Sequence, residues 1–152
     1  MKDKILIIQE NKQARFDYFI TDTYEAGLVL TGSEVKSLRL KNITFKDSYI
    51  SFVKDEAFLQ NAHISEYRAS SYNNHIPERL RKLLLNRKEL DEIYGSLREK
   101  GLSCVPLKIY FKEGMVKLEI GLAKGKKLHD KRESIKKRDV DQQLRQAKAR
   151  SR

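Results

Sequence analysis

Hydrophobic and polar residues alternate with a period of two along much of the chain, which is the pattern of β-strands with one buried face. The clearest case lies between Cys104 and Ala123, where two alternating runs flank a turn at Glu113-Gly114. This pattern predicts a β-hairpin. Its apolar positions are Val105, Leu107, Ile109 and Phe111, followed by Val116, Leu118, Ile120 and Leu122.

Shorter alternating runs predict further strands. A second hairpin is expected from residue 48 to residue 62, with Ile50 and Phe52 answered by Phe58 across a turn at Asp55-Glu56. Residues 16–21 and 27–30 are also expected to be strands, which gives about six strands in all.

Helical spacing is less frequent. Ser33 can cap a short helix that runs through Arg39. A second helix is expected to begin at Pro77, because proline suits the first helical position and leucines follow at positions 80, 83 and 84.

A third helix is marked by a capping box, in which Glu89 follows Asn86 by three residues, and it stops at Gly101. Together these elements predict a mostly β fold: a small antiparallel oligonucleotide-binding-like barrel of about six strands with about three short helices. We expect residues 1–122 to form this body and residues 123–152 to form a separate tail.

Positive charge is concentrated in the tail. The whole chain carries 32 Lys and Arg against 21 Asp and Glu. Twelve of those basic residues and four of the acidic ones lie in residues 123–152, a net charge of +8. Such a segment has too little apolar surface to order itself when free, and its charge favours a polyanionic partner. A compact body with a basic tail is typical of a protein that meets nucleic acid at two places.

Several classes of protein are disfavoured. The single cysteine, Cys104, excludes an internal disulfide or a cysteine-rich zinc site, and no metal-ligand spacing or cofactor motif is seen. The apolar runs are too short to span a membrane, and the first residues lack a secretory signal, so a cytoplasmic protein is expected. Catalysis finds little support, because His63, His75 and His129 lie in different segments.

Basic residues combine with aromatic and amide side chains in three clusters. Any one of these clusters can be ordinary solvated surface, but merged on one face they could follow an RNA backbone while Tyr or Asn contacts unpaired bases. The clusters are Asn11, Lys12, Arg15 and Tyr18 at the expected first strand; Lys36, Arg39 and Lys41; and Arg79, Arg81, Lys82, Arg87 and Lys88.

Ordered motifs along nearly the whole chain resemble the family of small protein B, the SsrA-binding proteins. They are Asn11-Lys-Gln-Ala-Arg-Phe-Asp-Tyr18, Tyr24-Glu-Ala-Gly27, Gly32-Ser-Glu-Val-Lys-Ser-Leu-Arg39, Asp47-Ser-Tyr49, Arg81-Lys-Leu-Leu-Leu-Asn86 and Gly125-Lys-Lys-Leu-His-Asp-Lys-Arg132. One departure is Lys41, which stands where the family usually has a glycine that would permit a positive φ.

The resemblance implies a monomeric, non-enzymatic adaptor that binds transfer-messenger RNA (tmRNA) one to one and delivers it to stalled ribosomes in trans-translation. The family's contacts to the tRNA-like domain fall on Asn11, Glu25 and Leu84, although the spacing of Leu84 suits a core position equally well. The expected tmRNA-binding set is Asn11, Lys12, Arg15, Tyr18, Glu25, Lys36, Arg39, Leu84 and Asn86.

The resemblance also assigns the tail to the ribosome. There it is expected to enter the empty mRNA channel of the small subunit near the decoding centre and to become helical. The residues concerned are Gly125, Lys126, Lys127, His129, Asp130, Lys131 and Arg132. Two other hypotheses remain: a structural ribosomal protein, which shares a basic tail on a small fold, and an RNA-processing enzyme, which the missing catalytic constellation disfavours.

Overall fold

Strands dominate the computed structural model, which describes residues 4–68 and 74–126. In chain order the elements are β1 (Ile5–Glu10), α1 (Lys12–Asp17), β2 (Tyr18–Leu28), α2 (Gly32–Arg39), β3 (Ile43–Thr44), β4 (Tyr49–Val53), β5 (Glu56–Gln60), β6 (His63–Ile64), β7 (Arg81–Leu84), α3 (Arg87–Lys100), β8 (Ser103–Lys112) and β9 (Met115–Gly125).

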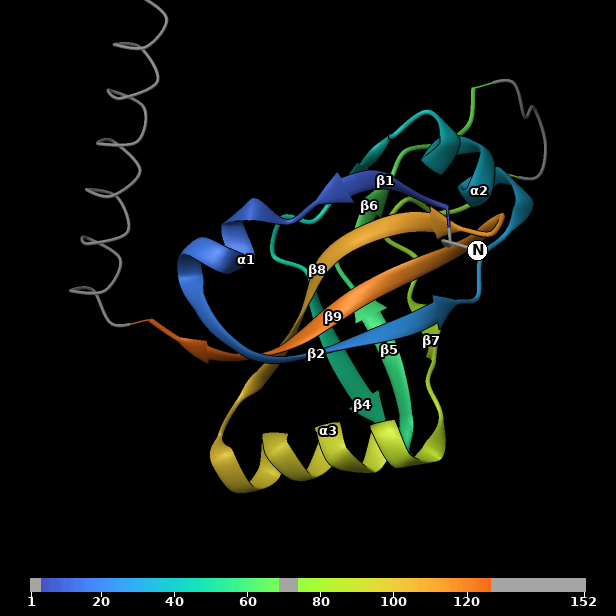
Figure 1. Cartoon of the computed structure of the whole chain (residues 1–152). Coiled ribbons are helices and arrows are strands. Elements are labelled where there is room, and N and C mark those ends of the chain that lie inside the picture. Colours follow the sequence, from blue (N-terminus) through green and yellow to red (C-terminus); the bar gives the residue numbers. More distant parts are fainter. Residues whose placement is uncertain (1–3, 69–73, 127–152) are drawn as a thin grey trace, which may run out of the picture.

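Seven of these strands form one antiparallel sheet in the order β1-β8-β9-β2-β7-β5-β4, while β3 and β6 form a separate antiparallel pair. The large sheet curls so that β4, at one edge, lies close to β8. Helix α3 runs across one end of the sheet, and α1 and α2 lie well apart, near opposite ends of β9 (Figure 1). The expected antiparallel, oligonucleotide-binding-like architecture is confirmed, as a curled sheet that is not closed by hydrogen bonds.

Apolar side chains pack on both faces of this sheet. The main core lies inside the curl and includes Leu59, Ile93, Leu118 and Ile120, all with no exposed surface. A second, small cluster lies under α1 on the opposite face. It consists of Ala14, Val105, Leu107 and Ala123, with Tyr18 and Ile20 packed against it.

The predicted hairpin from Cys104 to Ala123 is confirmed as β8 and β9, with positive φ angles of 52° at Glu113 and 79° at Gly114 in its turn. Its apolar residues do not share one face, however. The register shifts between Pro106 and Lys108, and this bulge moves alternate side chains to the other face. Leu107 therefore packs under α1, whereas Ile109 belongs to the main core.

The second predicted hairpin is confirmed as β4 and β5, but its turn and its pairing differ from the prediction. The positive φ angles lie at Lys54 and Asp55 rather than at Asp55-Glu56. As a result Ile50 faces Leu59, whereas Phe58 faces Ser51 on the opposite side of the sheet. A shift of one residue at a turn moves every following side chain to the other face.

The first two predicted strands are one strand. β2 has 11 residues and stays continuous through a register shift between Ile20 and Asp22, while Phe16 belongs to α1. Strands β1, β3 and β6 were not predicted.

The third predicted helix, α3, is confirmed with both capping contacts and with Gly101 as a left-handed C-cap at φ 63°. Helix α2 is also present, but Thr31 rather than Ser33 is its N-cap. The helix expected at Pro77 is wrong. That segment forms β7, which pairs with β2 and β5, and its leucines alternate between exposed and buried as a strand requires. No helix within the described ranges is long and apolar enough to cross a membrane.

Candidate nucleic-acid interface

Asn11 anchors α1 to the bulge in β8. Its Oδ1 accepts from the backbone N–H of Ala14 at 3.3 Å, and its Nδ2 donates to the carbonyl of Pro106 at 2.8 Å. Its backbone N–H donates to the carbonyl of Leu107 at 2.7 Å. Asn11 is thus the cap of a helix. The expectation from the sequence that it begins a strand is wrong.

The basic residues of α1 lie beside charged residues of the sheet. Arg15 Nη2 lies 3.7 Å from Glu119 Oε1, and Lys108 Nζ lies 3.6 Å from Glu119 Oε2. Lys12 and Arg15 also line a small cavity of about 100 Å³ with Lys108. Because Arg15 is 61% exposed, its ion pair is weak and its guanidinium remains accessible to phosphate.

The face of the sheet that carries Glu119 is here named the outer sheet face. Cross-strand partners share a face, so the register places Glu25, Lys117 and Tyr110 on it as well. Leu84 pairs with Gly27 and therefore also lies on this face. It is 53% exposed, whereas its neighbour Leu83 is 2% exposed and belongs to the core. The structure therefore supports an exposed position for Leu84 and not a core position.

Glu25 is held by two donors on β8. The hydroxyl of Tyr110 donates to Glu25 Oε2 at 2.5 Å, and Lys112 Nζ lies 3.3 Å from both carboxylate oxygens. The hydrogen bond from Tyr110 lowers the pKa of Glu25, and burial together with the same hydrogen bond raises the pKa of Tyr110. Glu25 is therefore ionised and Tyr110 is protonated at neutral pH. Neither Tyr110 nor Lys112 was proposed from the sequence.

Tyr18 lies at the margin of the outer sheet face, where it packs against the cluster under α1. It lines two neighbouring grooves of about 650 and 550 Å³, both of which also include Asp47 and Ser48. A tyrosine in such a groove can offer a stacking surface to an unpaired base.

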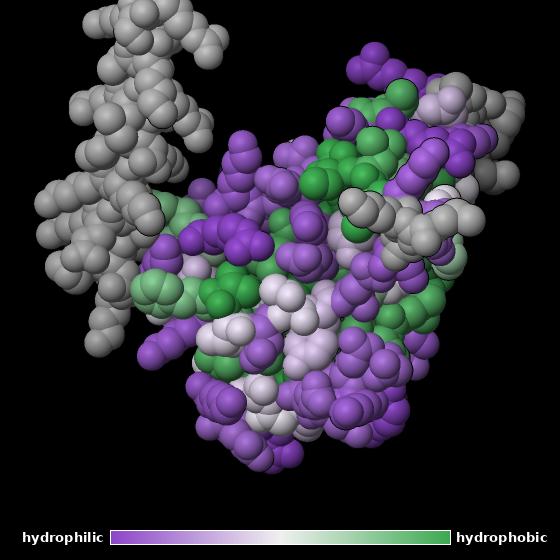
Figure 2. Space-filling view, in the orientation of Figure 1, coloured by the Kyte–Doolittle hydropathy of each residue, from purple (hydrophilic) through white to green (hydrophobic). Residues whose placement is uncertain are grey.

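Hydrophilic side chains cover most of the view in Figure 2, and hydrophobic surface gathers near β1. In that strand Ile5, Leu6 and Ile7 are 53%, 63% and 40% exposed. Ile5 and Ile7 pair with Lys112 and Tyr110 and continue the outer sheet face to its edge, whereas Leu6 pairs with Phe111 and lies on the opposite face.

The remaining predicted contacts lie elsewhere or have structural roles. Lys36 and Arg39 are exposed on α2, where Lys36 Nζ lies 5.6 Å from the centre of the Tyr67 ring. Asn86 is exposed and caps α3 by accepting from the backbone N–H of Glu89 at 2.9 Å. The structure therefore brings Asn11, Lys12, Arg15, Tyr18, Glu25 and Leu84 to one face, and it does not place Lys36 or Arg39 there.

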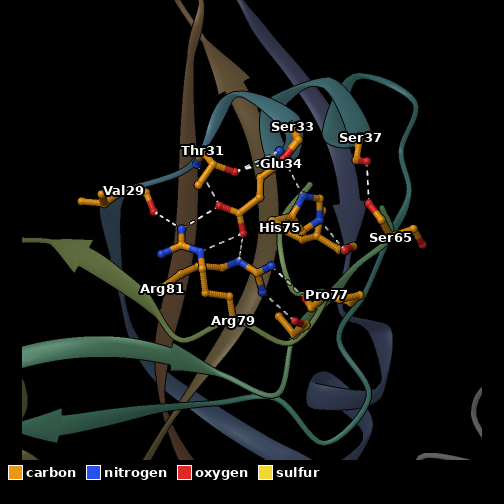
Figure 3. Close-up of polar contacts among 12 residues, drawn as sticks. Val29, Thr31, Ser33, Glu34, Ser37, Ser65, His75, Pro77, Arg79 and Arg81 are labelled. Atoms are coloured by element: carbon orange, nitrogen blue, oxygen red, sulfur yellow. Dashed lines mark hydrogen bonds and ion pairs between the residues drawn. The ribbon is translucent and has the colours of Figure 1, made fainter. Parts of the chain in front are cut away.

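Two residues of one predicted basic cluster, Arg79 and Arg81, belong to a structural network around Glu34. Arg81 has no exposed surface, and its Nε donates to Glu34 Oε2 at 2.5 Å. Arg79 Nη2 donates to Glu34 Oε1 at 2.6 Å, as does the backbone N–H of Thr31 at 2.8 Å (Figure 3). The remaining Arg81 donors reach the carbonyls of Ala62 and Pro77. The hypothesis that Arg81 contacts phosphate is therefore wrong.

Electrostatics stabilise the ionised form of Glu34 within this network. Burial acts to raise the pKa of Glu34, but the hydrogen bonds from Arg79, the backbone of Thr31 and Arg81 outweigh it and lower the pKa to about 2. His75, also buried, lies 2.8 Å from both Ser33 Oγ and the carbonyl of Ile64. These contacts fix α2 against the segment that leads into β7.

Other reactive groups are structural. Burial raises the pKa of the Cys104 thiol to about 12, so this side chain is a thiol at neutral pH. Within residues 4–68 and 74–126, no group of three or more His, Cys, Asp or Glu side chains is arranged to hold a metal ion.

The expected tail begins as part of the sheet. Ala123 is 1% exposed, Gly125 ends β9, and the backbone N–H of Lys126 donates to the carbonyl of Asp17 at 2.9 Å. Lys126 Nζ lies 5.1 Å from the centre of the Phe19 ring. The other predicted tail contacts, Lys127, His129, Asp130, Lys131 and Arg132, lie outside the described residues.

Comparisons with known proteins match almost the whole chain. A sequence model of the family described as "SmpB protein" matches residues 8–150. The chain is 70% identical to the SsrA-binding protein of Bdellovibrio bacteriovorus over 152 residues, 100% of both chains. It is 55% identical to the SsrA-binding protein of Pelobacter propionicus over 141 residues, 93% of both chains. It is 54% identical to that of Gloeothece citriformis over 145 residues, 95% of this chain and 94% of the relative.

A solved structure described as "tmRNA-SmpB: a journey to the center of the bacterial ribosome" contains a chain that is 47% identical. The match covers 84% of this chain and 93% of that chain, with a TM-score of 0.68. The similarity therefore extends to the fold.

Proposed function

This chain belongs to the SmpB protein family, and from that premise we propose that it binds tmRNA and acts with it on stalled bacterial ribosomes in trans-translation. The observation that carries the proposal is the similarity over the full chain, in sequence and in fold, to SsrA-binding proteins. The partners are tmRNA, bound one to one, and the ribosome. The protein acts in the cytoplasm as an adaptor, without catalysis and without a cofactor.

The outer sheet face supplies the chemistry for the tRNA-like domain of tmRNA. Arg15 and Lys12 provide positive charge for phosphates at one end, and Leu84 offers an exposed apolar contact at the other. Glu25 lies between them and accepts hydrogen bonds, which suits ribose hydroxyls or base amines. Positive charge alone would bind any RNA, so the acceptor and the apolar contact are what give selectivity.

The tail acts on the ribosome. Its density of Lys and Arg suits the empty mRNA channel, where rRNA phosphates surround it and it becomes helical. Because Ala123 is buried and Lys126 bonds to Asp17, a truncation that tests the tail is best placed after Lys126. The tail then corresponds to residues 127–152.

Peptide tagging of stalled ribosomes in a reconstituted translation system tests this division of labour. We expect the full chain to support tagging, and a chain ending at Lys126 to bind tmRNA but to abolish tagging. Asp130→Ala with Lys131→Ala and Arg132→Ala is expected to do the same within the intact tail. Tagging by the truncated chain at the rate of the full chain would overturn the role of the tail.

Two further assays, sedimentation with ribosomes and incubation with tmRNA alone, test the two rival functions. A structural ribosomal protein would sediment permanently with ribosomes and would form no free complex with tmRNA. An RNA-processing enzyme would convert tmRNA to a shorter product when incubated with it alone. Either result would contradict the adaptor function.

A further inference from the structure

We propose that Tyr110 is a positioning residue that orients the Glu25 carboxylate to accept a hydrogen bond from tmRNA, with Lys112 as the second support. The RNA group is an O–H or N–H donor, either a ribose 2′-hydroxyl or a base amine. This inference rests on the proposed function, and it assigns to β8 a part in recognition that the sequence did not reveal.

The geometry of the three side chains carries this inference. Tyr110 and Lys112 are two residues apart on β8, and both reach across β9 to Glu25 on β2. The Tyr110 residue is 4% exposed, so its ring is fixed by packing, while 37% of the Glu25 side chain is exposed. A buried tyrosine thus holds one carboxylate oxygen of a side chain that is partly exposed to solvent.

The acceptor capacity of Glu25 is not exhausted. An ionised carboxylate offers roughly four lone-pair sites and no donor. Tyr110 and Lys112 supply three hydrogen bonds, one of them to Oε1. A position therefore remains for a donor from RNA. A phosphate cannot take this position because it has no proton to donate and carries the same sign of charge.

The surroundings of Glu25 suit a nucleic acid. The exposed side chain of Leu84 packs over Gly27, two residues further along β2, where a Cβ would lie 3.3 Å from Leu84 Cβ, and so an apolar contact lies close to the carboxylate. Lys117 pairs with Gly27 and adds a cation beside the carboxylate. An RNA strand can therefore place its sugar edge or base edge at Glu25 while its phosphates meet lysines.

Binding of tmRNA to the full chain with the substitution Tyr110→Phe tests the role of the hydroxyl. Removing the hydroxyl leaves the ring in place, so the thermal melt is expected to stay close to that of the wild type. We expect binding to weaken by about tenfold because the carboxylate loses its orienting donor. The matched control is Tyr24→Phe, which removes a hydroxyl bonded to Glu92 at 3.3 Å on the other side of the sheet and should leave binding unchanged.

A double-mutant cycle separates positioning from a general structural effect. In a Glu25→Gln background, Tyr110→Phe is expected to change tmRNA affinity by less than about twofold, because the hydroxyl acts through that carboxylate. Multiplicative losses in the double variant would show that Tyr110 acts independently of Glu25 and would overturn the inference. So would wild-type affinity in Tyr110→Phe.

Modified RNA then identifies the donor. Transcripts of the tRNA-like domain with 2′-deoxy sugars remove the hydroxyl, and transcripts with inosine in place of guanosine remove the exocyclic amine. One of these changes should weaken binding to the wild type and have little effect on binding to Glu25→Gln. Equal losses in both proteins, for both kinds of transcript, would exclude a 2′-hydroxyl and a guanine amine as the donor at Glu25. Failure of the wild type to bind unmodified tmRNA would refute the proposed function itself.

Discussion

Replacing Glu34 by glutamine tests whether the buried network holds α2 in place. Glu34 and Arg81 are both fully buried, and the Glu34 carboxylate accepts from Arg79, Arg81 and the backbone of Thr31. Glutamine keeps the size of the side chain but removes the charge. Arg81 then remains buried without a counter-charge, which typically costs about 3 to 5 kcal/mol of unfolding free energy.

The pKa of Glu34 gives an independent magnitude and a pH window. Its pKa falls from an ordinary 4.5 to about 2 on folding, because the hydrogen bonds from Arg79, Thr31 and Arg81 outweigh the effect of burial. A carboxyl with a depressed pKa stabilises the folded state above the unfolded pKa, here by about 3 kcal/mol. This stability is lost as the pH falls from about 5 toward 2.

Urea denaturation of the wild type and Glu34→Gln at pH 7 and pH 3 measures the loss of unfolding free energy and its dependence on pH. We expect the difference in unfolding free energy to be about 3 to 5 kcal/mol at pH 7 and about 2 kcal/mol smaller at pH 3. The matched control is Glu78→Gln, at an exposed carboxylate 2.6 Å from His63 Nδ1, where we expect no measurable change at pH 7. A difference below about 1 kcal/mol at pH 7 would refute the reasoning, as would a difference that is independent of pH. If Glu34→Gln is unfolded at pH 7, Arg79→Gln removes one donor of the same carboxylate and should still show the pH-dependent loss.

Three further changes test other parts of the structure. Asn11→Ala removes the cap of α1 and its bond to Pro106, and should lower the unfolding free energy by about 1 to 2 kcal/mol in urea; an unchanged midpoint would contradict the anchoring role. Lys41 adopts a φ of 61°, so Lys41→Gly should relieve strain and leave the melting temperature equal or higher; a clear decrease would show that the lysine side chain contributes to stability. Arg15→Ala should reduce the salt dependence of tmRNA binding by a slope of about 1, and an unaltered slope would place Arg15 away from the RNA backbone.

The sequence predicted the local features of the fold because they depend on neighbouring residues. The alternation in β8 and β9 and the capping box at Asn86 are examples, and both are present where expected. The turn at Lys41 was not predicted: the absence of the glycine usual in the family left its geometry open, and the structure shows that the lysine itself adopts a positive φ of 61°. Where the interactions are not local, the prediction failed. β7 resembled a helix because its leucines have helical spacing, and only pairing with β2 and β5 makes it a strand.

Only part of the candidate site was predictable, because contacts between residues far apart in the sequence leave no local pattern. The resemblance placed Asn11, Glu25 and Leu84 in the site, and the structure brings them to one face. The resemblance could not show that Arg81 is neutralised by Glu34, which is 47 residues away in the sequence. Nor did the sequence indicate Tyr110, whose hydroxyl meets a carboxylate 85 residues away. A weak signal was present: Tyr110 takes a polar position of an otherwise apolar alternation, between Lys108 and Lys112.

Selective binding of tmRNA is the central claim, and a gel-shift titration of the full chain against tmRNA tests it most directly. Bulk tRNA serves as competitor, and the salt concentration is varied because the phosphate contribution weakens as salt rises. The account predicts a one-to-one complex with tmRNA that survives an excess of tRNA at physiological salt. Equal competition by tRNA at every salt concentration would show that the protein binds RNA through charge alone, and would contradict the claim.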